Sequence, residues 1–159
     1  MTANPIAASG RLLAFQGPPH AVFPGGAVAI WFTRPSGFVV QFLQPTHGTG
    51  EIARFIAREG TDRLLSLAAP SEPLIFVHDF SLLTGYESEA RRILTDKGAT
   101  IRSRVERIVV VPPPETMKIV RMGLAAAAAT LSLLGVRIST EASLMTAVAR
   151  LGLSRRDDL

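Results

Sequence analysis

The strongest constraint on the fold comes from two short apolar runs that end in polar or proline residues. Residues 73–79 read PLIFVHD, and residues 107–112 read RIVVVP. A strand with one face in water alternates apolar and polar side chains, whereas a continuous apolar run is typical of a strand buried on both faces. The sequence therefore predicts a sheet whose central strands are covered on both sides.

Further elements are indicated around these two runs. Residues 27–33 and 37–43 are rich in β-branched and aromatic side chains, and a turn at 34–36 separates them, so we expect a β-hairpin. Apolar spacing, caps and stops predict four helices: one from the N-cap Thr49 to the break at 69–70 with a pause at Gly60, one over 87–95 stopped by Gly98, one from Pro114 to Leu134, and one over 141–151 ended by Gly152. A third parallel strand is expected at 136–138.

This order predicts an α/β fold with a single domain and a mixed sheet, in which an N-terminal hairpin precedes parallel strands and about four helices. The domain is expected to span residues 27–152. Residues 1–26 form a tail and loop, with an optional first strand at 11–16, because residues 17–26 hold three prolines and three glycines. Residues 153–159 are expected to form a charged C-terminal tail.

The composition excludes several classes of protein. There is no cysteine, which rules out a disulfide scaffold, a Cys-ligated metal site and a Cys nucleophile. The three histidines, at positions 20, 47 and 78, are too far apart for a metal-binding helix motif, so we expect no metal and no cofactor. The net charge of +4 comes from scattered basic residues, and aromatic residues make up only 6%, so we expect no nucleic-acid partner.

Neither a signal peptide nor a membrane anchor is predicted. The longest uncharged apolar stretch, residues 122–136, is shorter than the roughly 20 residues that a membrane span needs. Residues 1–10 lack the basic and apolar regions of a signal peptide. We therefore expect no membrane insertion and a cytoplasmic location.

Three segments carry a resemblance to a known family. VHDFS at 77–81 closes a buried strand, IVVVPPP at 108–114 ends another, and VRISTEASL at 136–144 precedes the terminal helix. Together with the order of elements over 27–151, they resemble the SpoIIAA-like branch of the STAS domains, the bacterial fold of anti-sigma-factor antagonists. The resemblance implies a non-catalytic module that regulates by binding a protein, either an anti-sigma-factor-like kinase or another STAS-type protein.

The same resemblance implies a docking surface with a phosphorylation site. In the antagonists, a strand ending in an Asp-Leu-Ser type sequence is followed by Asp-Ser-Ser-Gly at a helix start, and the first Ser of that motif is phosphorylated. Here Ser88 occupies that position and Glu87 stands for the Asp, but the second Ser is Glu89 and the Gly is missing. The alternative is that Ser88 only caps the helix. The implied partner-binding residues are Asp79, Ser81, Thr84, Glu87, Ser88, Pro112 and Pro113.

An enzyme is the weaker alternative. His78 and Asp79 end a central strand, which is where open α/β sheets bind ligands, and Ser81, Thr84 and Glu87 lie just beyond. Adjacent strand residues point to opposite faces, so His78 and Asp79 cannot orient one another. No Gly-x-Ser-x-Gly nucleophile motif is present. We therefore expect no catalytic residues.

Two further alternatives concern ligands and self-association. Related folds enclose lipid-like ligands between helices and sheet, so the protein could instead carry an apolar small molecule or lipid. That function predicts a cavity lined by residues such as Phe55, Leu83, Met122 and Leu131. The helix around the alanine run 125–129 is apolar nearly all round, so it either packs inside the domain or is shared with a second copy in a homodimer.

Overall fold

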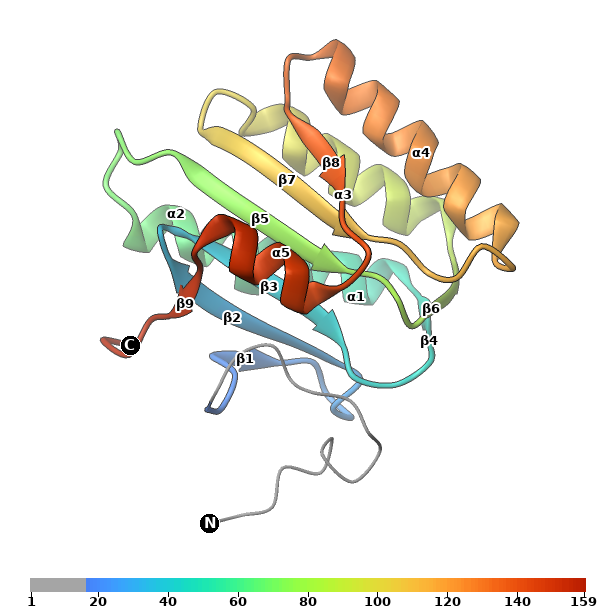
Figure 1. Cartoon of the computed structure of the whole chain (residues 1–159), viewed down its shortest axis with the longest axis horizontal. Helices are drawn as coiled ribbons and strands as arrows, with labels where there is room; N and C mark the ends of the chain where they lie inside the picture. Colours follow the sequence, from blue (N-terminus) through green and yellow to red (C-terminus); the bar gives the residue numbers. More distant parts are fainter. Residues whose placement is uncertain (1–16) are drawn as a thin grey trace.

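The computed structural model describes residues 17–159, which fold around a seven-stranded sheet (Figure 1). β2 and β3 form an antiparallel hairpin, and β5, β7 and β8 continue from β3 as parallel neighbours. β1 and β9 both pair with β2. The strands are β1 (Ala21–Val22), β2 (Val28–Arg34), β3 (Gly37–Phe42), β5 (Leu74–Asp79), β7 (Val105–Val111), β8 (Ile138–Thr140) and β9 (Ser154–Arg155).

Four helical segments accompany the sheet. The first is continuous and consists of α1 (Gly50–Phe55), the π-helical stretch η2 (Ile56–Asp62) and α2 (Arg63–Leu67). The others are α3 (Ser88–Thr100), α4 (Lys118–Leu133) and α5 (Leu144–Leu151). The protein is thus an α/β single domain with a mixed sheet, an N-terminal hairpin, parallel later strands and four helices, as the sequence predicts.

Local signals in the sequence account for several helix ends. The Thr49 hydroxyl accepts a hydrogen bond from the backbone N–H of Ile52 at 3.2 Å, which makes Thr49 the N-cap of α1. Gly152 ends α5 with φ of 62°, a left-handed conformation that glycine adopts readily. The pause expected at Gly60 corresponds to the π-helical stretch η2. In a π-helix the backbone hydrogen bonds join residues five apart instead of four.

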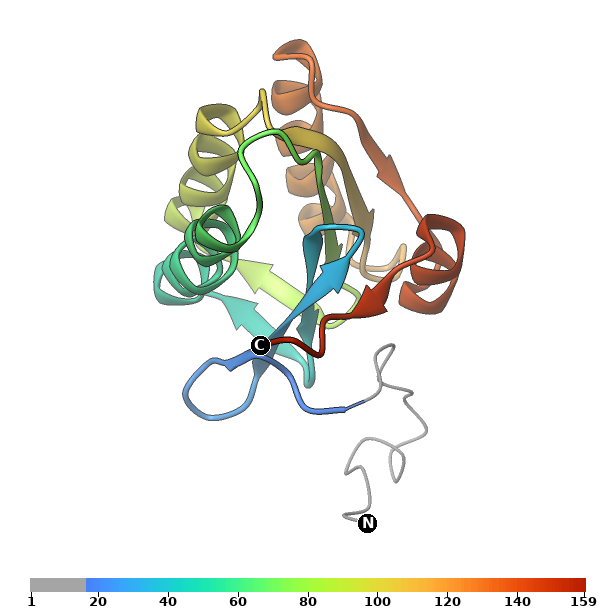
Figure 2. The ribbon, with the colours of Figure 1, turned by 90° about the vertical axis from the view of Figure 1, so that its left-hand side faces the viewer.

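The two faces of the sheet pack against different helices because side chains alternate along each strand. Phe38 and Phe76 belong to the larger core, which also contains side chains of α1, η2 and α4. Val39 and Val77, their neighbours in sequence, belong to the smaller core with Leu144 of α5. Figure 2 shows α5 alone on one side of the sheet and the other helices on the opposite side.

Several local features differ from the expectation. Helix α3 does not stop at Gly98 but continues to Thr100, and Gly98 packs against Leu131 of α4. Helix α4 begins at Lys118 rather than at Pro114, and α5 begins after the N-cap Ser143 rather than at residue 141. The third parallel strand spans Ile138–Thr140 rather than 136–138. β4 (Thr46–Gly48) and β6 (Leu83–Tyr86) form a separate two-stranded parallel sheet that the sequence did not indicate.

Both ends of the described chain pack against the hairpin. The His20 ring accepts the N–H of Phe32 at 2.9 Å through Nδ1, and its Nε2 bonds the carbonyl oxygen of Arg156 at 2.9 Å. Arg156 is buried and pairs with Asp158 at 2.8 Å. The segment expected to be a charged tail therefore contributes β9 and an ion pair, and the segment expected to be a loop contributes β1. The optional strand at 11–16 lies outside the described residues.

No helix within residues 17–159 has the length and hydrophobicity that crossing a membrane requires.

Candidate ligand-binding site

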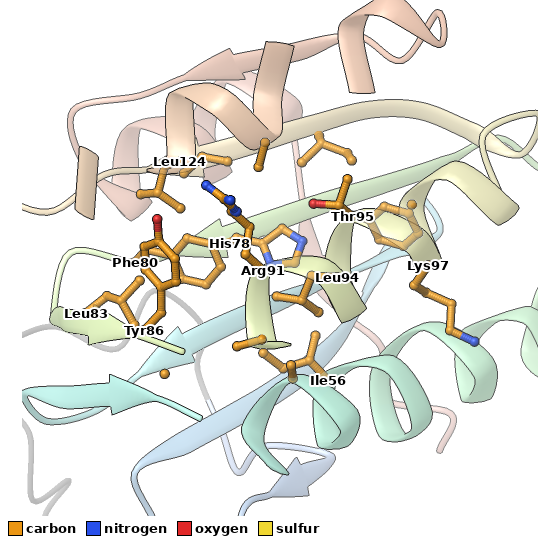
Figure 3. Close-up of a pocket in the computed structure, with 18 of the residues that line it drawn as sticks. Ile56, His78, Phe80, Leu83, Tyr86, Arg91, Leu94, Thr95, Lys97 and Leu124 are labelled. Atoms are coloured by element: carbon orange, nitrogen blue, oxygen red, sulfur yellow. The ribbon is translucent and has the colours of Figure 1, made fainter. Parts of the chain in front are cut away.

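A cavity of about 140 Å³ lies between the sheet and helices α1, α3 and α4. Its wall is almost entirely apolar. Strands β3, β5 and β7 form its floor, and the helices and β6 form its sides and cover (Figure 3). The large apolar side chains that line it include Phe38, Phe42, Ile52, Ile56, Phe76, Phe80, Leu83, Leu94, Ile108, Leu124 and Leu131.

Small residues on α3 and α4 leave the space open. Gly123, Ala127 and Ala128 line the cavity from α4, and Ala90 and Gly98 line it from α3. Larger side chains at these positions would fill the gap between helices and sheet. Gly123 is also required for the position of Tyr86, because a Cβ there would lie 1.4 Å from the tyrosine hydroxyl oxygen.

His78 places a polar ring inside this apolar wall. It lies near the carboxyl end of β5, with ring centroids 5.8 Å from Phe38 and 5.2 Å from Phe80. Its Nδ1 is buried and has no hydrogen-bond partner among residues 17–159. Burial lowers the pKa of His78 to about 4, because the charged imidazolium loses its solvation there. The ring is therefore neutral at pH 7.

Other polar side chains also line the cavity, among them Tyr86, Arg91 and Thr95. Figure 3 shows Arg91 and Thr95 of α3 and the ring of His78 along the cavity, with Tyr86 at its end beside Leu83. Within the described part of the chain, none of these three side chains forms an ion pair or hydrogen bond, whereas Lys97 pairs with Asp62 at 2.7 Å. Together with His78, they can supply polar contacts to a bound molecule.

The predicted cavity residues are partly correct. Leu83 and Leu131 line the cavity. Phe55 is buried in the core without lining it, and Met122 is 71% exposed on the opposite face of α4. Because α4 is apolar on both sides, periodicity alone did not distinguish its inner face from its outer face.

The sequence analysis singled out His78 but missed Arg91 and Thr95. Arg91 is exposed on α3 and also lines the cavity. Arg91, Thr95 and Gly98 are spaced i, i+4 and i+7, which places them on one helix face. That spacing is the signal that could have identified them.

The residues of the implied docking surface have different environments. Asp79 is buried, and its Oδ1 accepts the N–H of Ser81 at 3.1 Å. Thr84 is exposed. Pro112 is half-buried and Pro113 is buried. His78 and Asp79 form no hydrogen bond with one another, as expected for neighbours that point to opposite sides of a strand.

Ser88 is the first residue of α3 and is exposed between two acidic side chains. Glu87 Oε1 accepts the N–H of Gly50 at 3.2 Å, and Glu89 pairs with Arg54 at 2.7 Å. The helix start favours a phosphate on Ser88, but the two adjacent carboxylates repel it, and Arg54 is already paired. The phosphorylation of Ser88 stays a prediction of the family resemblance.

No three His, Asp or Glu side chains within residues 17–159 form a group that could hold a metal ion. Comparisons with family models, with curated proteins and with solved structures gave no match to this chain. The resemblance to the STAS domains therefore also stays a prediction, and the site is interpreted from its own geometry.

Proposed function

We propose that this protein is a non-catalytic module that binds a small apolar molecule in the cavity beneath α3 and α4. The observation that carries this proposal is an apolar cavity bordered by polar side chains without partners in the described chain. Ligand sites are typically apolar with a few polar groups that fix orientation. No hydrogen bond joins any two of His78, Tyr86, Arg91 and Thr95, which favours holding a molecule over transforming it.

The volume of the cavity limits the size of the ligand. An engineered cavity of about 150 Å³ lined by Leu, Ile and Phe binds benzene in another protein. The cavity of about 140 Å³ therefore fits a single ring or a chain of similar size. This is smaller than a long-chain lipid, so the carrier function is proposed for a small molecule. A cytoplasmic location remains an expectation.

A cavity-filling substitution tests this function with toluene as the probe. We expect toluene to stabilise the folded protein and so to raise its unfolding temperature. At a toluene concentration of 100 times Kd, the free energy of unfolding should increase by about 2.7 kcal/mol. Ala128 lines the cavity, so Ala128→Leu is expected to abolish this effect. Ala125 is exposed on the same helix and does not line the cavity, so Ala125→Leu provides the matched control and keeps the effect. Toluene without effect on the native chain, or an equal loss in both variants, would contradict the proposal.

We also propose that two copies associate through the outer face of α4, the homodimer left open by the sequence. Ile119, Met122 and Leu133 are 83%, 71% and 90% exposed on this helix. With Ala126 and Ala129 they follow the alternating three- and four-residue spacing of a helix–helix seam. Such a large exposed apolar face is typical of an interaction surface.

Charge favours an antiparallel arrangement of the two copies. Lys118 lies exposed in the first turn of α4, and the helix contains no acidic residue. In an antiparallel pair, each Lys118 lies beside the negative end of the partner helix dipole, whereas a parallel pair would bring the two lysines together. The self-complementary contact fits a two-fold dimer.

Two methionines provide a matched test of this interface. Sedimentation velocity is expected to give twice the mass of one chain for the native protein. Met122→Lys should give a monomer, because the charge enters the seam. Met145→Lys, on the exposed part of α5, should leave the dimer intact. If the native protein is a monomer at all concentrations, or if the dimer survives Met122→Lys, then the outer face of α4 is not the dimer interface.

A further inference from the structure

We propose that the apolar molecule bound in the cavity is the ring of a small aromatic carboxylic acid, whose carboxylate lies at the cavity wall and is held by Arg91. The inference rests on the proposed ligand-binding function and names the chemical class of the ligand. It depends on the distribution of charge around the cavity, which the apolar lining alone does not determine.

Among the described residues that line the cavity, one cationic side chain, Arg91, has no ion-pair partner. Arg91 and Lys97 are the charged residues that line it. Lys97 is neutralised by Asp62, whereas Arg91 has no ion-pair partner among residues 17–159. No Asp or Glu belongs to the lining residues. Arg91 is exposed to solvent and lines the cavity, so a bound ligand with a negative charge would pair with it.

The chemistry of the neighbouring groups favours a carboxylate. A guanidinium group presents planar, paired donors that match the two oxygens of a carboxylate. The Thr95 hydroxyl, four residues after Arg91 on α3, and the His78 ring line the same cavity (Figure 3), and both groups can donate a hydrogen bond. Because the His78 ring is neutral at pH 7, it offers a single N–H and adds no charge.

The remaining wall accounts for the aromatic part of the ligand. Phe38, Phe76 and Phe80 line the cavity, and aliphatic side chains of α1, β7 and α4 form the rest of its apolar wall. A benzene ring fits the available volume, and aromatic rings pack favourably edge-to-face against phenylalanine. An aromatic acid such as benzoate satisfies both the apolar wall and the unpaired guanidinium.

Calorimetric titration at pH 7 with four probes separates this inference from the proposed function. Toluene, benzyl alcohol, benzylamine and benzoate share one ring and differ in the attached group. We expect benzoate to bind at least about ten times more tightly than benzyl alcohol, since hydrogen bonds to charged groups are the stronger ones. Benzylamine, which is cationic, is expected to bind more weakly than either.

Two adjacent arginines provide the matched variants. Arg91→Gln should remove the preference for benzoate over benzyl alcohol. Arg92 is exposed and does not line the cavity, so Arg92→Gln should keep the preference. If toluene binds but benzoate binds no more tightly than benzyl alcohol, the carboxylate inference is wrong and the proposed function stands. If none of the four probes binds, both are wrong.

Discussion

Gly37→Ala is expected to destabilise the protein by about 4 kcal/mol, a large share of the roughly 5–15 kcal/mol that holds a typical domain folded. A Cβ at Gly37 would lie 1.8 Å from the carbonyl oxygen of Ile75 and 2.8 Å from its carbonyl carbon. Both atoms belong to the backbone of β5, so no side chain can turn aside. The parallel pairing of β3 with β5 at the centre of the sheet must separate locally.

Urea unfolding followed by tryptophan fluorescence measures this effect, since the only tryptophan, Trp31, is buried in β2. Gly85→Ala is the control. Its Cβ would lie 2.8 Å from Nδ1 of His47, an exposed side chain that can rotate away, so we expect a loss below about 1 kcal/mol. Equal stability of Gly37→Ala and the native chain would contradict the strand pairing described for β3 and β5.

Acid is expected to destabilise the native protein through His78. The pKa of this histidine is about 4 in the folded protein and about 6.5 in an unfolded chain. Between these two pH values the unfolded state binds a proton that the folded state does not. The free energy of unfolding is therefore highest above pH 6.5 and decreases as the pH falls to 4. The difference corresponds to about 3 kcal/mol.

The comparison with His78→Phe isolates this contribution. Carboxylates and His20, whose pKa burial also lowers, titrate alike in both proteins. The free energy of unfolding is therefore measured for both from pH 7 to pH 4 by urea titration. We expect the native curve to fall more steeply, by about 3 kcal/mol in total. Parallel curves would show that the His78 ring is not buried among apolar side chains.

Much of the fold follows from local sequence patterns. The continuous apolar run at 73–79 predicted β5, and the hairpin, the Thr49 cap and the Gly152 stop were also confirmed. These features depend on neighbours in the chain, which a sequence displays directly. The β4–β6 pair was missed because each strand has only three or four residues and depends on a partner far along the chain.

The candidate site was less predictable because it depends on the space between elements. The cavity exists where Gly98 faces Leu131 and Gly123 faces Tyr86, contacts that only the packing of α4 against α3 and β6 creates. The carrier alternative anticipated a cavity in the right layer, but Met122 lies on the outer face of α4. The orientation of an apolar helix is decided by tertiary packing, on which its own periodicity gives little information.

Nuclear Overhauser contacts between toluene and the methyl groups of the protein test the central claim most directly. The account predicts contacts from the toluene ring to the methyl groups of Ile108, Ala128 and Leu131, which line the cavity. Contacts confined to the exposed methyl groups of Ile119 and Leu133, or no contacts at saturating toluene, would contradict it.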